Sequence, residues 1–570
     1  MVTPPATREG EALLSAARML RDRVASARFP VDVPDASQAS VVRGELLHQL
    51  DDYVLPRLGS LDAPLLAVVG GSTGAGKSTL VNSVVGATVT TPGVLRPTTR
   101  SAVLVHHPDD RSWFADDRVL PDLSRVGGDA AVESPRTVQL VASSAIPAGM
   151  ALLDAPDIDS VVSENRMLAR QLLSAADLWL FVTTAARYAD AVPWDLLRQA
   201  QERGTSVAVV LDRVPPGSVG DIRDHLTGML AEQGLTDTPV FTVAEGGLDD
   251  EGRLPREQVG RLRTWLIALA SDQHARSEVV RATLTGALDS LDARVQVLVA
   301  ATEIQQEATR RLRGAGDSAF DQGLRAVVEG MSDGTLLRGE VLARWQEYVG
   351  TGEFFKQVES TVSRWRDQLM AAVRGETTRA DGLGEALHSG ISQLVRAEGS
   401  GAVATTAARW RGLAGGSEAL GGDPALQRLS DGFAERVDSL VHDWQTSVLE
   451  LVHTEGQDRR TRARVTAYGV NAVGTVLTLV TLASTAGLTG AEVGIAGGTA
   501  LLGQKLLEAI FGDQAVRSLA VTARATLLAR VEGLYADEQR RFTDAIAVLE
   551  VPHDQARALT AAADAVRNAR

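Results

Sequence analysis

The stretch GGSTGAGKST, Gly70–Thr79, constrains this chain more than any other segment. It follows the apolar run PLLAVV, which predicts a strand, and it precedes LVNSVVG, which predicts a helix beginning at about Lys77. The spacing Gly71-x-x-x-x-Gly76-Lys77-Ser78 between a strand and a helix is the Walker A pattern. In that pattern, backbone N–H groups and a helix N-terminus surround a phosphate group. We therefore expect a phosphate-binding loop here rather than an ordinary glycine-rich turn.

The choice of lysine at position 77 supports this interpretation. Lys77 is one of only three lysines in the chain, with Lys356 and Lys505, while arginine is used everywhere else. A lysine ammonium is a compact point charge that fits between β- and γ-phosphates, whereas a planar guanidinium is wider and directional. The next residue, Ser78, would supply its hydroxyl to Mg²⁺.

The region around the loop has the pattern of an α/β domain. Between residues 61 and 272, short apolar runs alternate with helical segments: PLLAVV, SAVLVHH, TVQLVA, GMALLD, DLWLFVTT, SVAVVLD and PVFTVA. This alternation is typical of a mainly parallel sheet with crossover helices. We predict an α/β P-loop domain over residues 61–272.

The flanking regions are predicted to be helical. Residues 1–60 form two amphipathic helices broken at Pro30–Pro34, and residues 512–570 form returning helices. Residues 273–464 form a long all-α stalk, with glycine-rich breaks expected near 314–316, 382–384 and 414–422. Two apolar stripes indicate its helices: Leu284, Leu288, Leu291, Val295 and Leu298, then Leu426, Leu429, Phe433, Val437, Leu440, Trp444, Val448 and Leu451.

Composition excludes several classes of function. The chain has 570 residues, so we expect several domains. Its 57 basic and 72 acidic residues give a net charge of −15, which argues against general nucleic-acid binding. The absence of cysteine excludes disulfides, thiolate zinc sites and cysteine nucleophiles and fits a reducing cytosol. The N-terminus lacks the basic and apolar regions of a signal peptide.

Two further segments suit a nucleotide with Mg²⁺. Asp154 ends the apolar run GMALLD, as the carboxylate that serves Mg²⁺ does in P-loop proteins. In RPTTR, Thr98 and Thr99 precede the run SAVLVHH, where a threonine closes over the γ-phosphate and Mg²⁺; we select Thr99. The alternatives are that Asp154 is an acidic turn residue and that Thr99 is an ordinary loop threonine.

These residues carry a resemblance to a known class. GSTGAGKST, PTTR, LLDAPD and the order of the strands resemble a translation-factor-class GTPase domain of the Era, septin and dynamin-like kind. With its long helical remainder, and a segment LRGEVLARWQEYVGTGEFF, the chain is similar to bacterial dynamin-like proteins of the actinobacterial kind. The resemblance implies GTP and Mg²⁺ as cofactors, and Lys77, Thr99 and Asp154 as catalytic residues. It also implies that Ser78, Thr99 and Asp154 bind the metal. The nucleotide contacts would come from Gly71, Ser72, Thr73, Gly74, Ala75, Gly76, Lys77, Ser78 and Thr79.

The chain departs from this class beside the γ-phosphate. Asp157 replaces the glycine of the pattern D-x-x-G, so its carboxylate would lie near phosphate charge or join the Mg²⁺ shell through water. Ile158 stands where many GTPases have a water-orienting glutamine. Thr73 and Gly74 occupy the positions of the Gln-Ser pair of dynamin. No residue obviously positions the attacking water.

The base-reading motif N/T-K-x-D is also altered. Asp212 stands at the asparagine position of the motif and Arg213 at the lysine position. Pro215 stands where the motif has its carboxylate. Asp212 would read the base itself, or it is a turn carboxylate at a strand end. GTP is therefore favoured over ATP by resemblance and not by this motif. An ABC-type ATPase is excluded because we find no LSGGQ-like segment and Ala155 follows Asp154.

Residues 465–511 predict an apolar helical hairpin. Val465–Ala491 contains no charged residue, Glu492 interrupts, and Val493–Gln504 is again uncharged. A bilayer span needs about 20 apolar residues, so the first part is long enough. The alternative is a hairpin buried in the protein or in an oligomer. The preceding basic residues would attract anionic lipid headgroups: Arg459, Arg460, Arg462 and Arg464.

These observations leave two functional hypotheses. The first is a dynamin-like protein that binds and hydrolyses GTP and couples it to membrane association or remodelling, with cell division as the leading process. It would act in the cytoplasm at the inner face of the cell membrane, as a homo-oligomer or paired with a related dynamin-like protein, without nucleic acid. The second is a hydrolysis-poor P-loop switch that acts as a scaffold for partner proteins, or an ATP-binding P-loop protein.

Overall fold

The computed structural model describes residues 8–90, 102–116, 118–120, 123–127, 137–158, 163–332, 377–455 and 513–570. Two compact units share the chain. The first comprises residues 1–29, 34–304 and 551–570, and the second comprises residues 30–33 and 305–550.

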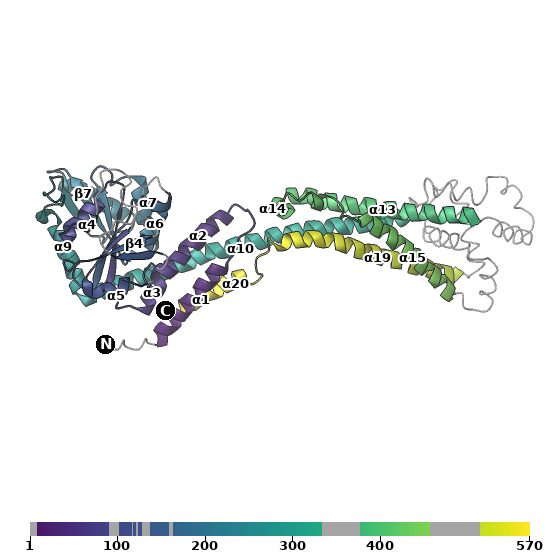
Figure 1. Ribbon diagram of the computed structural model, residues 1–570, viewed down its shortest axis with the longest axis horizontal. Helices are drawn as coiled ribbons and strands as arrows, with labels where there is room; N and C mark the ends of the chain where they lie inside the picture. Colours follow the sequence, from purple (N-terminus) through teal and green to yellow (C-terminus); the bar gives the residue numbers. More distant parts are fainter. Residues whose placement is uncertain are drawn as a thin grey trace, which may run out of the picture. The chain divides into compact units, whose positions relative to one another are not determined.

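A sheet of eight strands forms the centre of the first unit (Figure 1). Its order is β3-β4-β2-β5-β1-β6-β7-β8, and every pairing is parallel except that of β2 with β5. The strands are β1 (Leu65–Gly71), β2 (Ala102–His106), β3 (Ser124–Gly127), β4 (Thr137–Ala142), β5 (Met150–Asp154), β6 (Leu178–Thr184), β7 (Ser206–Val214) and β8 (Val240–Ala244). This topology confirms the predicted α/β fold. All seven predicted strands are present, and among the described residues only β3 was missed.

Helices cover both faces of the sheet, which explains the continuous apolar runs. All residues of β1 are buried, as expected for a central parallel strand. Leu65, Ala67 and Val69 pack with α4 (Lys77–Val85) and α9 (Arg256–Ser271). Leu66 and Val68 face the opposite layer. That layer contains α6 (Ser163–Ser174), α7 (Ala191–Glu202) and α8 (Val219–Glu232).

A second core in this unit is built from helices alone. Its elements are α1 (Arg8–Ser26), α2 (Ala36–Gln49), the π-helical turn η1 (Leu50–Val54), α3 (Leu55–Gly59), the first part of α10 (Gln273–Ser332) and α20 (Gln555–Asn568). The predicted stripe from Leu284 to Leu298 is buried in this core. Two short helices, η2 (Pro108–Asp110) and α5 (Arg111–Phe114), follow β2.

A buried ion pair joins the helical core to the sheet. Arg57 of α3 contacts the Asp177 carboxylate, and its Nη2 donates to the carbonyl oxygen of Pro64 at 2.8 Å. The same Asp177 Oδ2 accepts from the backbone N–H of Leu66 at 2.7 Å. Thr283 of α10 donates its hydroxyl to the Asp177 carbonyl at 2.9 Å. These contacts fix α3 and α10 against the amino ends of β1 and β6.

The second unit is helical. It contains the later part of α10 with α13 (Thr377–Arg411), α14 (Gly416–Leu420), η5 (Pro424–Gln427), α15 (Phe433–Glu455) and α19 (Asp513–Ala547). Leu527 and Val531, which lie in the predicted returning helices, are fully buried on α19. The long helical region of the predicted fold class is therefore confirmed.

The ends of several helices differ from prediction. α10 continues through residues 314–316, and α13 continues through 382–384, so only the break at 414–422 is present. A glycine inside a helix costs about 1 kcal/mol, which tertiary packing outweighs. α15 begins at Phe433 rather than Leu426, which lies in η5, because Gly432 takes a φ of 76°.

No helix in the described ranges is long and apolar enough to cross a bilayer. The predicted hairpin at 465–511 and the arginines at 459, 460, 462 and 464 lie outside the described residues.

Candidate nucleotide-binding site

The predicted phosphate loop joins the carboxyl end of β1 to the amino end of α4. At two of its positions only glycine fits. Gly76 has a φ of 89°, and a Cβ there would lie 2.5 Å from Asp212 Oδ2. A Cβ on Gly71 would overlap the carbonyl oxygen of Val182 on β6. The remaining predicted contact residues lie in the same loop or in the first turn of α4: Ser72, Thr73, Gly74, Ala75, Ser78 and Thr79.

Lys77 is buried at the start of α4, and its ammonium group is directed back over the loop. Its Nζ donates to the carbonyl oxygens of Gly71 at 3.0 Å and Ser72 at 3.1 Å. It also lies 2.5 Å from Asp157 Oδ1. Two carbonyl oxygens of the loop and the carboxylate of Asp157 therefore hold this buried ammonium group over the loop.

Asp154 ends β5 beside this loop and is completely buried. Its Oδ2 accepts hydrogen bonds from Ser78 Oγ at 2.7 Å and from Thr90 Oγ1 at 2.8 Å. Its Oδ1 is buried without a hydrogen-bond partner. Burial raises the pKa of the Asp154 carboxyl, against the lowering effect of these two hydroxyls.

The residues present fit a Mg²⁺ ion. Mg²⁺ is held in nucleotide sites by one or two carboxylate or hydroxyl oxygens together with phosphate oxygens and water. Ser78 and Asp154 supply a hydroxyl and a carboxylate in contact with each other. The unpartnered Oδ1 is a buried acceptor that a cation or its bound water would satisfy.

Asp157 and Ile158 follow β5 and have different environments. The Asp157 side chain is 18% exposed and forms the ion pair with Lys77. Ile158 is buried in the core beneath the sheet, and its N–H donates to the carbonyl oxygen of Gly71 at 3.4 Å. Ile158 therefore packs into the core instead of presenting a polar group to the site.

Asp212 lies near the end of β7 and is held against the phosphate loop. Its Oδ1 accepts from the backbone N–H of Arg213 at 2.8 Å, and its Oδ2 is the neighbour of Gly76 noted above. Burial raises the pKa of the Asp212 carboxyl. Arg213 adopts a φ of 53° at an irregularity of β7 and leaves its side chain 56% exposed.

Three residues near the site were not predicted. Thr90 contacts Asp154, and the amide side chain of Asn82 on α4 holds Thr90 in place. Arg187 Nη1 donates to the carbonyl oxygen of Thr73 at 3.3 Å. The one signal for Asn82 in the sequence is its spacing of four from Ser78, which places both on one face of a helix. The predicted Thr99, with Thr98, lies outside the described residues and stays a prediction.

Comparison with known proteins adds little. No protein-family profile and no curated protein matches the chain. Among solved structures, the chain is similar to two from an oligomerised bacterial dynamin pair, described as a mechanism for long-range sensing and tethering of membranes. One has a TM-score of 0.47 and 9% identity, covering 99% of this chain and 96% of the other. The second has a TM-score of 0.43 and 10% identity, covering 95% and 96%.

A third structure is Toc33 from Arabidopsis thaliana in complex with Mg²⁺ and GMPPNP. Its TM-score is 0.24 and its identity 14%, covering 43% of this chain and 93% of that one. With TM-scores below 0.5, these similarities assign no family to the chain.

Proposed function

We propose that this chain is a dynamin-like GTP-binding protein that binds and hydrolyses GTP with Mg²⁺. The observation that carries the proposal is the hydrogen bond from Ser78 to Asp154 at the carboxyl edge of a parallel sheet. Ser78 directly follows the buried Lys77 in the sequence. Ligands of such sheets bind at the carboxyl ends of the strands. Backbone N–H groups of the loop and the amino end of α4 would bind the phosphates.

Each charged residue has a distinct role in this proposal. Lys77 compensates the charge of the β- and γ-phosphates, and Ser78 and Asp154 hold Mg²⁺. The metal, when bound, neutralises charge that develops on the phosphate oxygens. Asp157 competes with the phosphates for Lys77, because its carboxylate already contacts the Nζ atom. Thr99 is proposed as a further ligand of the metal.

The identity of the base rests on resemblance. Asp212 is buried against Gly76, and the exposed Arg213 follows it. We assign both residues to nucleotide binding. Asp212 would support the phosphate loop, and Arg213 would lie at the end of the site that takes the base.

Competition binding tests the nucleotide. Unlabelled GTP and ATP would displace a fluorescent GTP analogue from the full chain in Mg²⁺. We expect GTP to compete at a concentration at least about tenfold lower, a difference of ~1.4 kcal/mol. Equal competition by ATP would assign the site to adenine nucleotides.

Release of phosphate, with Lys77→Ala as the control for contaminating activity, tests hydrolysis.

The remainder of the proposal concerns membranes and partners. The 465–511 hairpin and the four arginines that precede it are proposed to bind lipid at the inner face of the cell membrane. Pairing of the chain with itself or with a related dynamin-like protein, and a role in cell division, belong to the same proposal. The second hypothesis, a hydrolysis-poor switch acting as a scaffold, is favoured by two observations: Lys77 is paired with Asp157, and Ile158 is buried.

A further inference from the structure

The Thr90 hydroxyl donates a hydrogen bond to the carboxylate of Asp154, which we assign to Mg²⁺. Its Oγ1 lies 2.8 Å from Asp154 Oδ2, the same oxygen that accepts from Ser78 at 2.7 Å. Thr90 is only 4% exposed and Asp154 is fully buried. Two hydroxyl donors on one oxygen fix the rotation of the carboxylate, and they leave Oδ1 without a partner. Oδ1 is therefore the oxygen that remains available to the metal or its bound water.

Asn82 fixes Thr90 in this position. Its Oδ1 accepts from the backbone N–H groups of Val89 at 2.9 Å and Thr90 at 3.0 Å. Its Nδ2 donates to the carbonyl oxygen of Thr90 at 2.8 Å. Asn82 is itself 2% exposed and lies one turn of α4 beyond Ser78. The helix that follows the phosphate loop thus places both hydroxyls that contact Asp154.

We infer that Thr90, held by Asn82, is a positioning residue for the Mg²⁺ site. Hydrogen bonds to a metal-binding carboxylate fix its orientation, and their loss typically costs 10–100-fold in metal affinity. The inference rests on the proposed function, because it assigns Asp154 to the metal. It predicts that removing the Thr90 hydroxyl weakens the response to Mg²⁺ while leaving metal-free nucleotide binding intact.

The test compares four full-length proteins: the wild type, Thr90→Val, Thr90→Ser and Thr406→Val. Thr406 is an equally buried threonine of α13 whose hydroxyl bonds only within its helix, so it controls for loss of a buried hydroxyl. Binding of a fluorescent GTP analogue is titrated with Mg²⁺ and repeated in EDTA. Mg²⁺ is expected to increase the affinity for the analogue. We expect Thr90→Val to reach half of that increase at a Mg²⁺ concentration at least about tenfold higher than the wild type does. Thr90→Ser and Thr406→Val should match the wild type, and all four should bind alike in EDTA.

Two results would overturn the inference. One is an unchanged Mg²⁺ requirement in Thr90→Val. The other is weakening by the same factor in EDTA and in Mg²⁺, which would make Thr90 a support of loop shape only. If Thr90→Val proves insoluble, Thr90→Ala is compared with Thr90→Ser in the same titration. Failure of the wild type to bind the analogue at all would instead overturn the proposed function, so the two failures are distinguishable.

Discussion

At the scale of single residues, Asp157 is the most unusual group in the site. Its Oδ1 lies 2.5 Å from Lys77 Nζ, where the lysine would otherwise meet a phosphate oxygen. Asp157→Gly removes this competitor and a like charge beside the γ-phosphate. We expect GTP to bind about tenfold more tightly, a gain of ~1.4 kcal/mol, or to be hydrolysed faster. Asp157→Asn, which keeps the size and loses the charge, should give most of the gain. Loss of Mg²⁺-dependent binding in Asp157→Gly would instead make Asp157 part of the metal shell.

The stability that the buried Asp154 contributes to the ligand-free protein should fall as the pH rises. Burial raises the pKa of Asp154 in the folded state, so the folded protein retains this proton over a pH range in which the unfolded chain has lost it. The stability contributed by the protonated group is complete below the ordinary carboxyl pKa of about 3.9, and it is lost as the pH rises through the folded-state pKa. Asp154→Asn mimics the protonated form. Its melting temperature without nucleotide or Mg²⁺ should equal that of the wild type at low pH. At higher pH it should exceed that of the wild type, by a difference that grows until the pH passes the folded-state pKa of Asp154 and then stays constant. A constant difference across the pH range would contradict this account.

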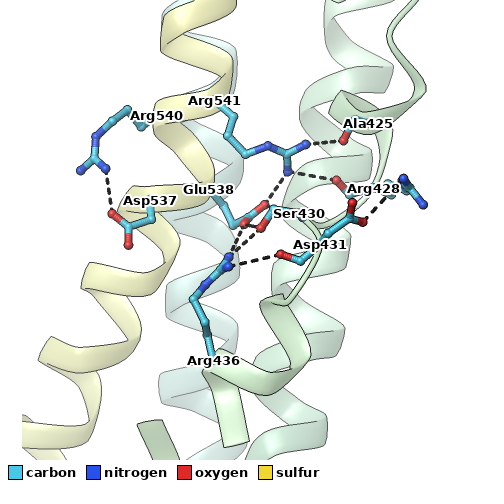
Figure 2. A network of polar contacts seen from close by, with 9 residues as sticks. All are labelled: Ala425, Arg428, Ser430, Asp431, Arg436, Asp537, Glu538, Arg540 and Arg541. Carbon is cyan, nitrogen blue, oxygen red and sulfur yellow. Dashed lines mark hydrogen bonds and ion pairs between the residues drawn. The ribbon is translucent and has the colours of Figure 1, made fainter. Parts of the chain in front are cut away.

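At the scale of elements, a buried carboxylate joins α19 to the segment before α15 (Figure 2). Glu538 is 1% exposed, and its Oε2 accepts from the Ser430 N–H at 3.1 Å. Arg541 Nη1 lies 2.7 Å from the same Oε2, and Arg436 Nη2 lies 3.1 Å from Oε1. Glu538→Ala leaves these donors without their acceptor. We expect it to destabilise the helical unit by roughly 2–3 kcal/mol, below the 3–5 typical of a fully buried pair, because Arg436 can turn to solvent.

Figure 2 also contains the matched control. Arg540, on the same helix, pairs with Asp537 at 2.9 Å, and both side chains are more than half exposed. Arg540→Ala should cost less than about 1 kcal/mol. Hydrogen exchange of peptides covering residues 425–436 and 530–545 measures both variants locally. Similar exchange rates in the two would show that Glu538 contributes no more than a surface pair.

The elements that were predictable are those whose burial determines their composition. Strands covered by helices on both faces must be continuously apolar, which makes runs such as LWLFVTT easy to assign. The edge strand β3 is half-exposed, so SRVG carries no such signal. Glycines at 314 and 316 failed as helix breaks because packing along α10 outweighs their cost.

The site was partly predictable for a similar reason. Spacing alone makes Lys77 and Ser78 candidate site residues, and a strand end makes Asp154 a candidate. The contacts of Asp157 with Lys77 and of Thr90 with Asp154 join residues 80 and 64 positions apart. They depend on how the folded sheet brings its loops together, which a linear pattern does not encode.

At the scale of the whole molecule, the proposal links nucleotide binding to a lipid surface. Deleting Val465–Gln504 should abolish flotation with liposomes that contain anionic lipid. Burial of apolar side chains, at about 25 cal/mol per Å², is the larger part of that binding. Replacing Arg459, Arg460, Arg462 and Arg464 by glutamine should weaken binding by a few kcal/mol at most, about 1 kcal/mol per residue and less at high salt. A deleted protein that still floats would place the membrane contact elsewhere.

The central claim is that the 71–79 loop binds GTP through Lys77. Titration of the full chain with a fluorescent GTP analogue in Mg²⁺ tests it most directly, with the wild type, Lys77→Ala and Lys77→Arg side by side. We predict saturable binding by the wild type and at least about 100-fold weaker binding by Lys77→Ala, ~2.7 kcal/mol or more. Lys77→Arg should also be impaired, because a planar guanidinium does not replace a compact ammonium. Wild-type affinity in both variants would contradict the assignment of this loop to the nucleotide.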